Sequence, residues 1–141
     1  MSNTDSEKLQ IVVVEDSMAD VVLLRQALDE HIGKSRYELR VFRDGAQGMH
    51  FVEHGSGTDR PDLMVVDINL PSYTGLEILQ RMRQQTWLSE TPVAILTTSD
   101  SKSERDQAER LGISCYLRKP PELFDFIALG AVLKRCVGTA P

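Results

Sequence analysis

Short apolar runs rich in β-branched residues recur along the chain and alternate with amphipathic segments. Four continuous runs predict strands that are buried on both faces: Ile11 to Val14, Leu63 to Val66, Val93 to Leu96 and Ile113 to Leu117. A fifth run, Tyr37 to Phe42, alternates apolar and polar residues, which predicts an edge strand.

The segments between these runs have helical spacing, and their ends carry capping signals. Three expected helix starts have a hydroxyl residue followed three positions later by an acid, the pattern of a capping box: Ser17, Thr74 and Ser101. Gly33 and Gly112 follow expected helices, where a left-handed residue is favoured. A short helix is expected around residues 48–53, and a last helix after Pro121 should end near Cys136.

Strand and helix thus alternate five times, which indicates an α/β fold. This pattern requires a parallel sheet that is covered by helices on both faces and connected by right-handed crossovers. Ligands of such sheets bind outside the carboxyl ends of the strands, at the point where strand order reverses. Candidate chemistry is therefore expected at those ends.

Composition narrows the class of protein. With 141 residues, of which 41% are hydrophobic, the chain is long enough for one globular domain and too short for two of ordinary size. A net charge of -5 and the lack of a basic run argue against direct binding to nucleic acid. The longest nearly apolar stretch, Phe126 to Leu133, is too short to span a membrane, so we expect a cytoplasmic protein. Cys115 and Cys136 lack metal-binding spacing and are expected to be reduced, partly buried thiols.

Carboxylates follow two of the expected strands. Glu15 and Asp16 come directly after the first strand, and Asp67 follows the third in the chain. Two unit charges about 4 Å apart repel by about 4 kcal/mol at an effective dielectric constant near 20, so such a cluster needs a proton or a cation. Oxygen ligands without histidine or cysteine suit Mg²⁺.

A hydroxyl and an ammonium are expected at the same edge of the sheet. Thr97 ends the fourth strand and Lys119 follows the fifth. An ammonium can pair with a carboxylate or a phosphoryl oxygen, and a hydroxyl can donate a hydrogen bond to either. Together with the acids they predict a phosphoryl pocket in which Asp67 can act as nucleophile and form an acyl phosphate.

These residues, in this order, resemble the receiver domain of two-component response regulators. The resemblance covers about residues 9–136, and the intervals of 30 positions from Asp67 to Thr97 and 22 from Thr97 to Lys119 are typical of the family. Its carriers are Val14-Glu15-Asp16, Val66-Asp67-Ile68-Asn69-Leu70-Pro71 with Gly75, Leu96-Thr97, and Tyr116-Leu117-Arg118-Lys119-Pro120. It implies a flavodoxin-like (βα)5 sandwich with strand order 2-1-3-4-5, flanked by tails at residues 1–8 and 137–141.

The resemblance also implies roles for individual residues. Asp67 would be the phosphoacceptor, and Lys119 would contact the phosphoryl group. Four groups would bind Mg²⁺: the carboxylates of Glu15, Asp16 and Asp67, and the backbone carbonyl of Asn69. Thr97 and Tyr116 would form a switch that changes the face built from the fourth helix, fifth strand and fifth helix.

As a member of this family, the chain would be a stand-alone phosphoacceptor switch rather than a metabolic enzyme. Its partners would be a sensor histidine kinase and a downstream protein or phosphotransfer protein. The segments Glu15 to Asp20 and Leu96 to Ser99 look like those of regulators paired with phytochrome-type kinases, although Met18 stands where that group commonly has proline. The apolar segment Leu123 to Val137 exceeds one helix stripe, so a homodimer through it and the fifth strand is expected.

Two other functions stay open at this point. A hydrolase of the haloacid dehalogenase type would also form an aspartyl phosphate, but it requires a second acid where Asn69 stands. A flavodoxin-like electron carrier would share the topology, but Glu15 and Asp16 would repel its phosphate. Thr97 and Tyr116, judged by residue type alone, are ordinary packing residues of strands.

Overall fold

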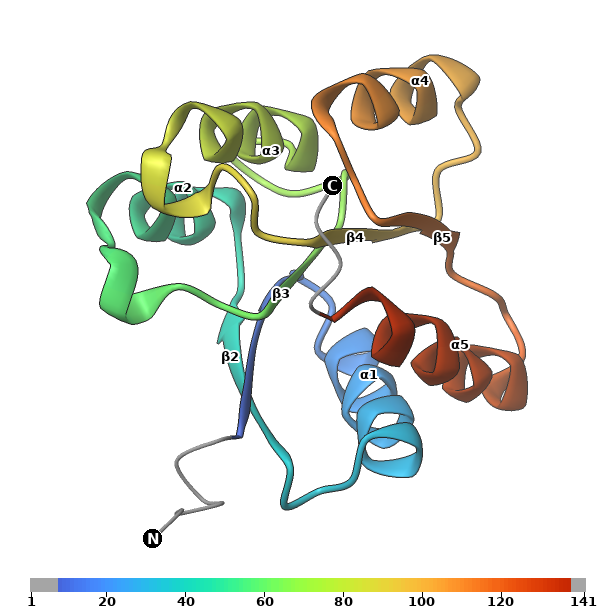
Figure 1. The fold of residues 1–141 in the computed structure, drawn as a ribbon. Helices are drawn as coiled ribbons and strands as arrows, with labels where there is room; N and C mark the ends of the chain where they lie inside the picture. The colour runs from blue at the N-terminus through green and yellow to red at the C-terminus, as the bar shows by residue number, and fades with distance from the viewer. Residues whose placement is uncertain (1–7, 138–141) are drawn as a thin grey trace, which may run out of the picture.

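A computed structural model describes residues 8–137, within which strands and α-helices alternate (Figure 1). Most of both predicted tails, residues 1–7 and 138–141, lies outside the described residues. The strands are β1 (Leu9–Val14), β2 (Tyr37–Phe42), β3 (Leu63–Val66), β4 (Val93–Thr97) and β5 (Cys115–Arg118). The helices are α1 (Met18–His31), α2 (Gly45–His54), α3 (Gly75–Gln84), α4 (Lys102–Leu111) and α5 (Leu123–Cys136). None of these helices combines the length and apolar character that crossing a membrane requires.

The strands form one parallel sheet in the order β2-β1-β3-β4-β5, which confirms the predicted fold class. β1 and β3 are buried over most of their length because they lie inside the sheet and are covered on both faces. β2 lies at one edge and is buried at Tyr37 but exposed at Glu38, as its alternating sequence predicted.

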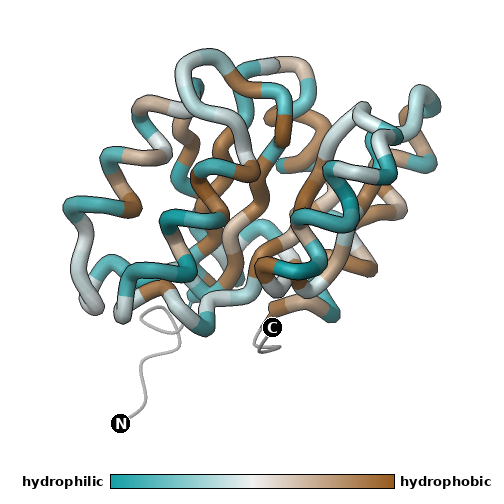
Figure 2. Tube along the Cα trace, turned by 90° about the horizontal axis from the view of Figure 1, so that it is seen from above, coloured by the Kyte–Doolittle hydropathy of each residue, from teal (hydrophilic) through white to brown (hydrophobic). Residues whose placement is uncertain are grey.

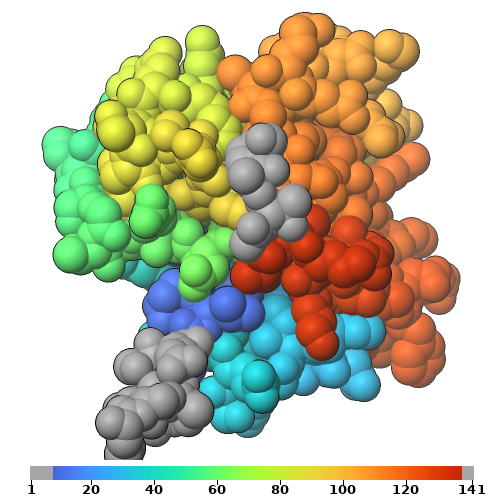
Figure 3. Space-filling view, in the orientation of Figure 1, coloured from blue at the N-terminus to red at the C-terminus, as the bar shows by residue number. Residues whose placement is uncertain are grey.

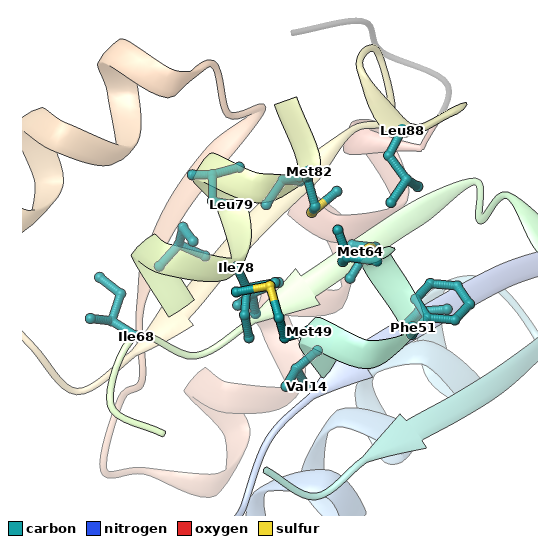
Figure 4. Close-up of a cluster of buried hydrophobic side chains, with 14 of the residues drawn as sticks. Val14, Met49, Phe51, Met64, Ile68, Ile78, Leu79, Met82 and Leu88 are labelled. Atoms are coloured by element: carbon teal, nitrogen blue, oxygen red, sulfur yellow. The ribbon is translucent and has the colours of Figure 1, made fainter. Parts of the chain in front are cut away.

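Helices cover both faces of the sheet. α1 and α5 pack together on one face, and α2, α3 and α4 lie side by side on the other (Figure 1). The apolar residues accordingly gather along the sheet between the two helix layers, as the hydropathy colours of Figure 2 show. In the layer under α2 and α3, Met49, Ile78 and Met82 meet Val14 and Met64 of the sheet (Figure 4).

The capping residues predicted from sequence begin the helices. The side chain of Ser17 accepts a hydrogen bond from the backbone of Asp20, and Thr74 and Ser101 cap α3 and α4 in the same way. Gly112 has a φ of 87° and ends α4, where a side chain would be strained. Local sequence therefore fixes where these helices start and where α4 stops.

Some predicted boundaries were wrong by one to three residues. β1 begins at Leu9 rather than Ile11, whereas β4 ends at Thr97 as predicted. The last strand is Cys115–Arg118 rather than Ile113 to Leu117. The physical reason is that Gly112 turns the chain out of α4, and residues 113–114 then return it to the sheet edge, where Cys115 pairs with Ala94. α2 starts at Gly45 because the Asp44 side chain caps it by accepting from Gln47.

Helix α4 is held at one end by an arginine of another helix. Only Ala108 of α4 is buried, because most other residues of this helix are charged or polar. Arg83 of α3 donates hydrogen bonds to the carbonyls of Leu111 (3.1 Å) and Gly112 (2.6 Å). The same guanidinium also binds carbonyls in the segment before β4, namely those of Leu88, Ser89 and Thr91. The C-terminal end of α4 is therefore fixed to the body of the domain.

The first turn of α3 packs directly against the backbone at the end of β3. A Cβ atom built on Gly75 would lie 2.1 Å from the carbonyl oxygen of Asp67 and 2.8 Å from its carbonyl carbon. Contacts this close to backbone atoms cannot be relieved by rotating a side chain. Only glycine permits α3 to start at this distance from Asp67.

Replacing Gly75 with alanine should therefore destabilise the protein, although alanine normally favours a helix. We expect the free energy of unfolding, measured by urea titration, to fall by about 1–3 kcal/mol. Gly57→Ala is the matched control, because nothing lies within 4 Å of a Cβ at that position. The control should change stability by less than about 0.5 kcal/mol, and equal stabilities of the two variants would contradict the close packing.

Candidate functional site

Strand register brings the predicted site residues to one edge of the sheet. Val14 of β1 pairs with Val66 of β3, so Glu15 and Asp67, which follow them, are neighbours. β4 lies on the other side of β3 and ends at Thr97. Thr97 in turn pairs with Arg118 of β5, the residue before Lys119. The topology alone thus gathers residues that are up to 104 positions apart in the sequence.

Three carboxylates form an oxygen cluster at this edge. One oxygen from each of Glu15, Asp16 and Asp67 lies within 4.8 Å of the other two. Glu15 and Asp67 are buried, at 3% and 6% exposure, while Asp16 is exposed. The cluster is therefore sunk into the domain on one side and open to solvent on the other. Its oxygen-only donor set fits a hard divalent cation such as Mg²⁺.

The Lys119 ammonium is surrounded by acids. Its Nζ lies 2.6 Å from Glu15 Oε1, 2.9 Å from Asp67 Oδ2 and 2.7 Å from Asp20 Oδ2. Only 7% of the Lys119 side chain is exposed. The sequence placed Lys119 at the same edge as the acids Glu15, Asp16 and Asp67, but it did not predict the contact with Asp20. The position of Asp20 could have indicated this contact, because the first turn of α1 follows β1 directly and therefore lies at the same edge of the sheet.

Hydrogen bonds hold the two buried carboxylates in place. The backbone N–H of Asn69 donates to Asp67 Oδ1 at 3.2 Å, while Lys119 binds Oδ2. The backbone N–H of Ser17 donates to Glu15 Oε2 at 3.1 Å, while Lys119 binds Oε1. Each oxygen of both carboxylates thus has one donor, which fixes the carboxylate planes. The predicted role of the Asn69 carbonyl as a metal ligand stays a prediction.

The electrostatic balance of the site is negative. Four carboxylates, those of Glu15, Asp16, Asp20 and Asp67, face one ammonium, which leaves a formal charge of three minus. Burial raises the pKa of Glu15 to about 7, and the nearby Asp67 adds to this rise while Lys119 opposes it. Burial would lower the pKa of Lys119, but its three carboxylate partners outweigh burial and raise it above the ordinary value. A divalent cation would offset the remaining charge.

Thr97 and Tyr116 are connected through the loop after β4. Thr97 is fully buried, and its Oγ1 accepts a hydrogen bond from the backbone N–H of Ser99 at 3.2 Å. The Tyr116 hydroxyl donates to the carbonyl of Ser99 at 3.4 Å. The guanidinium of Arg105 on α4 lies 5.4 Å from the centre of the Tyr116 ring. Ser99 therefore joins the two predicted switch residues, a connection that sequence spacing did not reveal.

The raised pKa of Glu15 makes a prediction about the metal-free protein. A carboxyl whose pKa rises on folding stabilises the fold below its unfolded pKa, and this contribution is lost as pH rises through the folded value of about 7. Between about pH 5 and pH 8 we therefore expect metal-free protein to lose on the order of 2–3 kcal/mol from this group.

Urea unfolding in a chelating buffer measures this loss. Glu15→Gln should flatten the pH dependence, because glutamine does not titrate, and Mg²⁺ should restore stability to the natural protein at high pH. A pH dependence that is the same in the variant would show that Glu15 is not the group responsible.

The comparisons with known proteins agree with this geometry. The family model described as the response regulator receiver domain matches residues 11–129. The chain is 33% identical to the response regulator Rcp1 of Synechocystis sp. over 132 residues, which is 92% of this chain and 88% of Rcp1.

Solved structures show the same likeness. The crystal structure of the phosphorylated cyanobacterial phytochrome response regulator RcpA matches with a TM-score of 0.82 at 27% identity, covering 95% of this chain and 99% of that one. The manganese-bound form of Rcp1 matches with a TM-score of 0.80 at 31% identity, covering 94% and 99%. Since the family model spans most of the chain and the match to Rcp1 covers most of both chains, the protein belongs to the response regulator receiver domain family.

Proposed function

We propose that this receiver domain accepts a phosphoryl group on Asp67 from a phosphohistidine of a sensor kinase, in a reaction that requires Mg²⁺. The observation that carries the proposal is the position of Asp67. Its buried carboxylate lies in the acidic cluster and also contacts the Lys119 ammonium at 2.9 Å. A nucleophile, a cation site and a fixed positive charge are the parts that phosphoryl transfer needs.

In this reaction a carboxylate oxygen of Asp67 forms a bond to phosphorus while the bond from phosphorus to the kinase histidine nitrogen breaks. The Asn69 N–H and Lys119 hold the Asp67 carboxylate in a fixed orientation before the transfer. The Lys119 ammonium then moves from the Asp67 carboxylate to the phosphoryl group and neutralises charge on the phosphoryl oxygens. Mg²⁺, when bound by the carboxylates of Glu15, Asp16 and Asp67, supplies further neutralisation of charge.

The proposed product is a signal rather than a released metabolite. The Thr97 hydroxyl can donate to a phosphoryl oxygen on Asp67, and the Ser99 backbone transmits its displacement to Tyr116. Asn69 stands where a dehalogenase-type hydrolase has its second acid, which favours a single phosphorylation over repeated turnover. The similarity to RcpA and Rcp1 supports a phytochrome-type kinase as the partner.

The C-terminal helix supports a homodimer. At the start of α5, Phe124 is 83% exposed and Leu123 is 48% exposed, while Phe126 and Leu133 of the same helix are buried. α5 lies at the molecular surface beside α1 (Figure 3). A helix that only covers the sheet needs one buried apolar stripe. α5 has such a stripe and also an exposed phenylalanine beside it. We propose that α5, with β5, forms the contact between two copies.

The assignment of the phosphoacceptor is tested by intact-mass measurement after incubation with acetyl phosphate and Mg²⁺. The natural protein should gain one phosphoryl group, and Asp67→Asn should gain none because an amide oxygen is too weak a nucleophile to attack phosphorus and displace acetate. Asp125→Asn, which alters an exposed acid at the start of α5, is the matched control and should be phosphorylated like the natural protein. An adduct on Asp67→Asn equal to that on the control would refute the assignment.

The dimer is tested by light scattering with and without beryllofluoride, a phosphoryl analogue. We expect the natural protein to form dimers in at least one of the two states and Phe124→Ala to weaken them by tenfold or more, about 1.4 kcal/mol. Val22→Ala removes an exposed apolar side chain of α1 and should leave the dimer unchanged. A monomer in both states at high concentration would exclude this interface.

A further inference from the structure

The two cysteines of the chain lie in direct contact, far from the acidic cluster. Cys115 is the first residue of β5 and Cys136 is the last residue of α5. Their Sγ atoms are 3.0 Å apart although the residues are 21 positions apart in the sequence. Both are free thiols, and the chain contains no other cysteine. Lys119 follows the opposite end of β5, so the pair is separated from the phosphorylation chemistry by the length of that strand.

The surroundings of the pair hold the two sulfur atoms together. Cys136 is buried at 6% exposure and Cys115 is partly buried in the same apolar cluster, which also contains Ala94, Phe126 and Leu133. Close-packed apolar neighbours restrict the rotation of both side chains. Forming a bond of about 2.05 Å requires the two sulfur atoms, now 3.0 Å apart, to approach by about 1 Å.

The contact also shifts the pKa values of the two thiols in opposite directions. The hydrogen bond with Cys115 lowers the pKa of Cys136 to about 7, against the effect of burial, and the charge of Arg135 lowers it further. The same contact, together with burial, raises the pKa of Cys115. Thiolate character determines which cysteine reacts first with an oxidant.

We propose that Cys115 and Cys136 are a redox modification site, at which a hydroperoxide converts the two thiols into an intramolecular disulfide joining β5 to α5. In the first step the Cys136 sulfur attacks a peroxide oxygen, the O–O bond breaks, and Cys136 becomes a sulfenic acid. In the second, the Cys115 sulfur attacks the sulfenic sulfur, the S–S bond forms and the S–O bond breaks. With hydrogen peroxide the two thiols lose two electrons and two protons in total, and the peroxide is reduced to two molecules of water.

The disulfide would connect β5 and α5, each of which packs mainly against another element of the fold. α5 packs chiefly against α1, and β5 pairs with β4 at the sheet edge. A covalent link between the start of β5 and the end of α5 closes a loop of 21 positions, which should raise Tm by roughly 5–10 °C. Thiol reductants reverse the link, so that the modification is switchable.

The test treats the full chain with hydrogen peroxide, quenches it, denatures it and alkylates the remaining thiols with iodoacetamide before intact-mass measurement. We expect a monomer that has lost two hydrogen atoms and takes up no alkyl group, and that takes up two after reduction with dithiothreitol. Formation should be at least about tenfold faster in folded protein than in urea, because folding supplies the contact between the sulfur atoms. Tm of the oxidised monomer should rise, and dithiothreitol should return it.

The single variants Cys115→Ser and Cys136→Ser are the matched controls. Neither can form the intramolecular bond, so neither should lose two hydrogen atoms as a monomer or gain Tm on oxidation. The proposal is overturned if the natural protein keeps two alkylatable thiols, or if its oxidised product is only a disulfide-linked dimer or a sulfinic acid. None of these readouts involves Asp67, so they stand apart from phosphorylation.

Discussion

The ion pairs of Lys119 are the interaction on which the edge of the sheet depends. One ammonium contacts acids from three elements: Glu15 after β1, Asp20 in α1 and Asp67 after β3. A cluster of charged side chains is costly to bury unless every charge has a partner. Removing the ammonium would leave several carboxylates facing one another. The lysine therefore lets a parallel sheet end in acids without forcing the strands apart.

The same arrangement leaves the site incompletely balanced, and this imbalance accounts for its chemistry. Burial raises the pKa of Glu15 and so favours its neutral form, while the exposed Asp16 keeps one side of the cluster in contact with water. A cation and a phosphoryl group can both enter from that side. The solved relative Rcp1 has been obtained with manganese bound, which agrees with the oxygen-rich cluster.

Much of this could be predicted from sequence because the determinants are local. β-branched runs predicted the sheet, and the capping residues Ser17, Thr74 and Ser101 predicted the helix starts. Boundaries near Gly112 were wrong because the path back to the sheet depends on register, which no local pattern encodes. The contact of Asp20 with Lys119 and the five carbonyls bound by Arg83 were missed for the same reason, since side chains that span elements become neighbours only through folding.

The two ends of α4 are attached to the rest of the domain by different contacts. Arg83 fastens the C-terminal end at Leu111 and Gly112, whereas the N-terminal end is attached through the Ser101 cap and a hydrogen bond from Ser99 to Glu104. Between these ends only Ala108 is buried. Because Arg83 holds the C-terminal end, a displacement of the chain after Thr97 would reach the exposed turn that begins at Lys102 before it reaches Leu111.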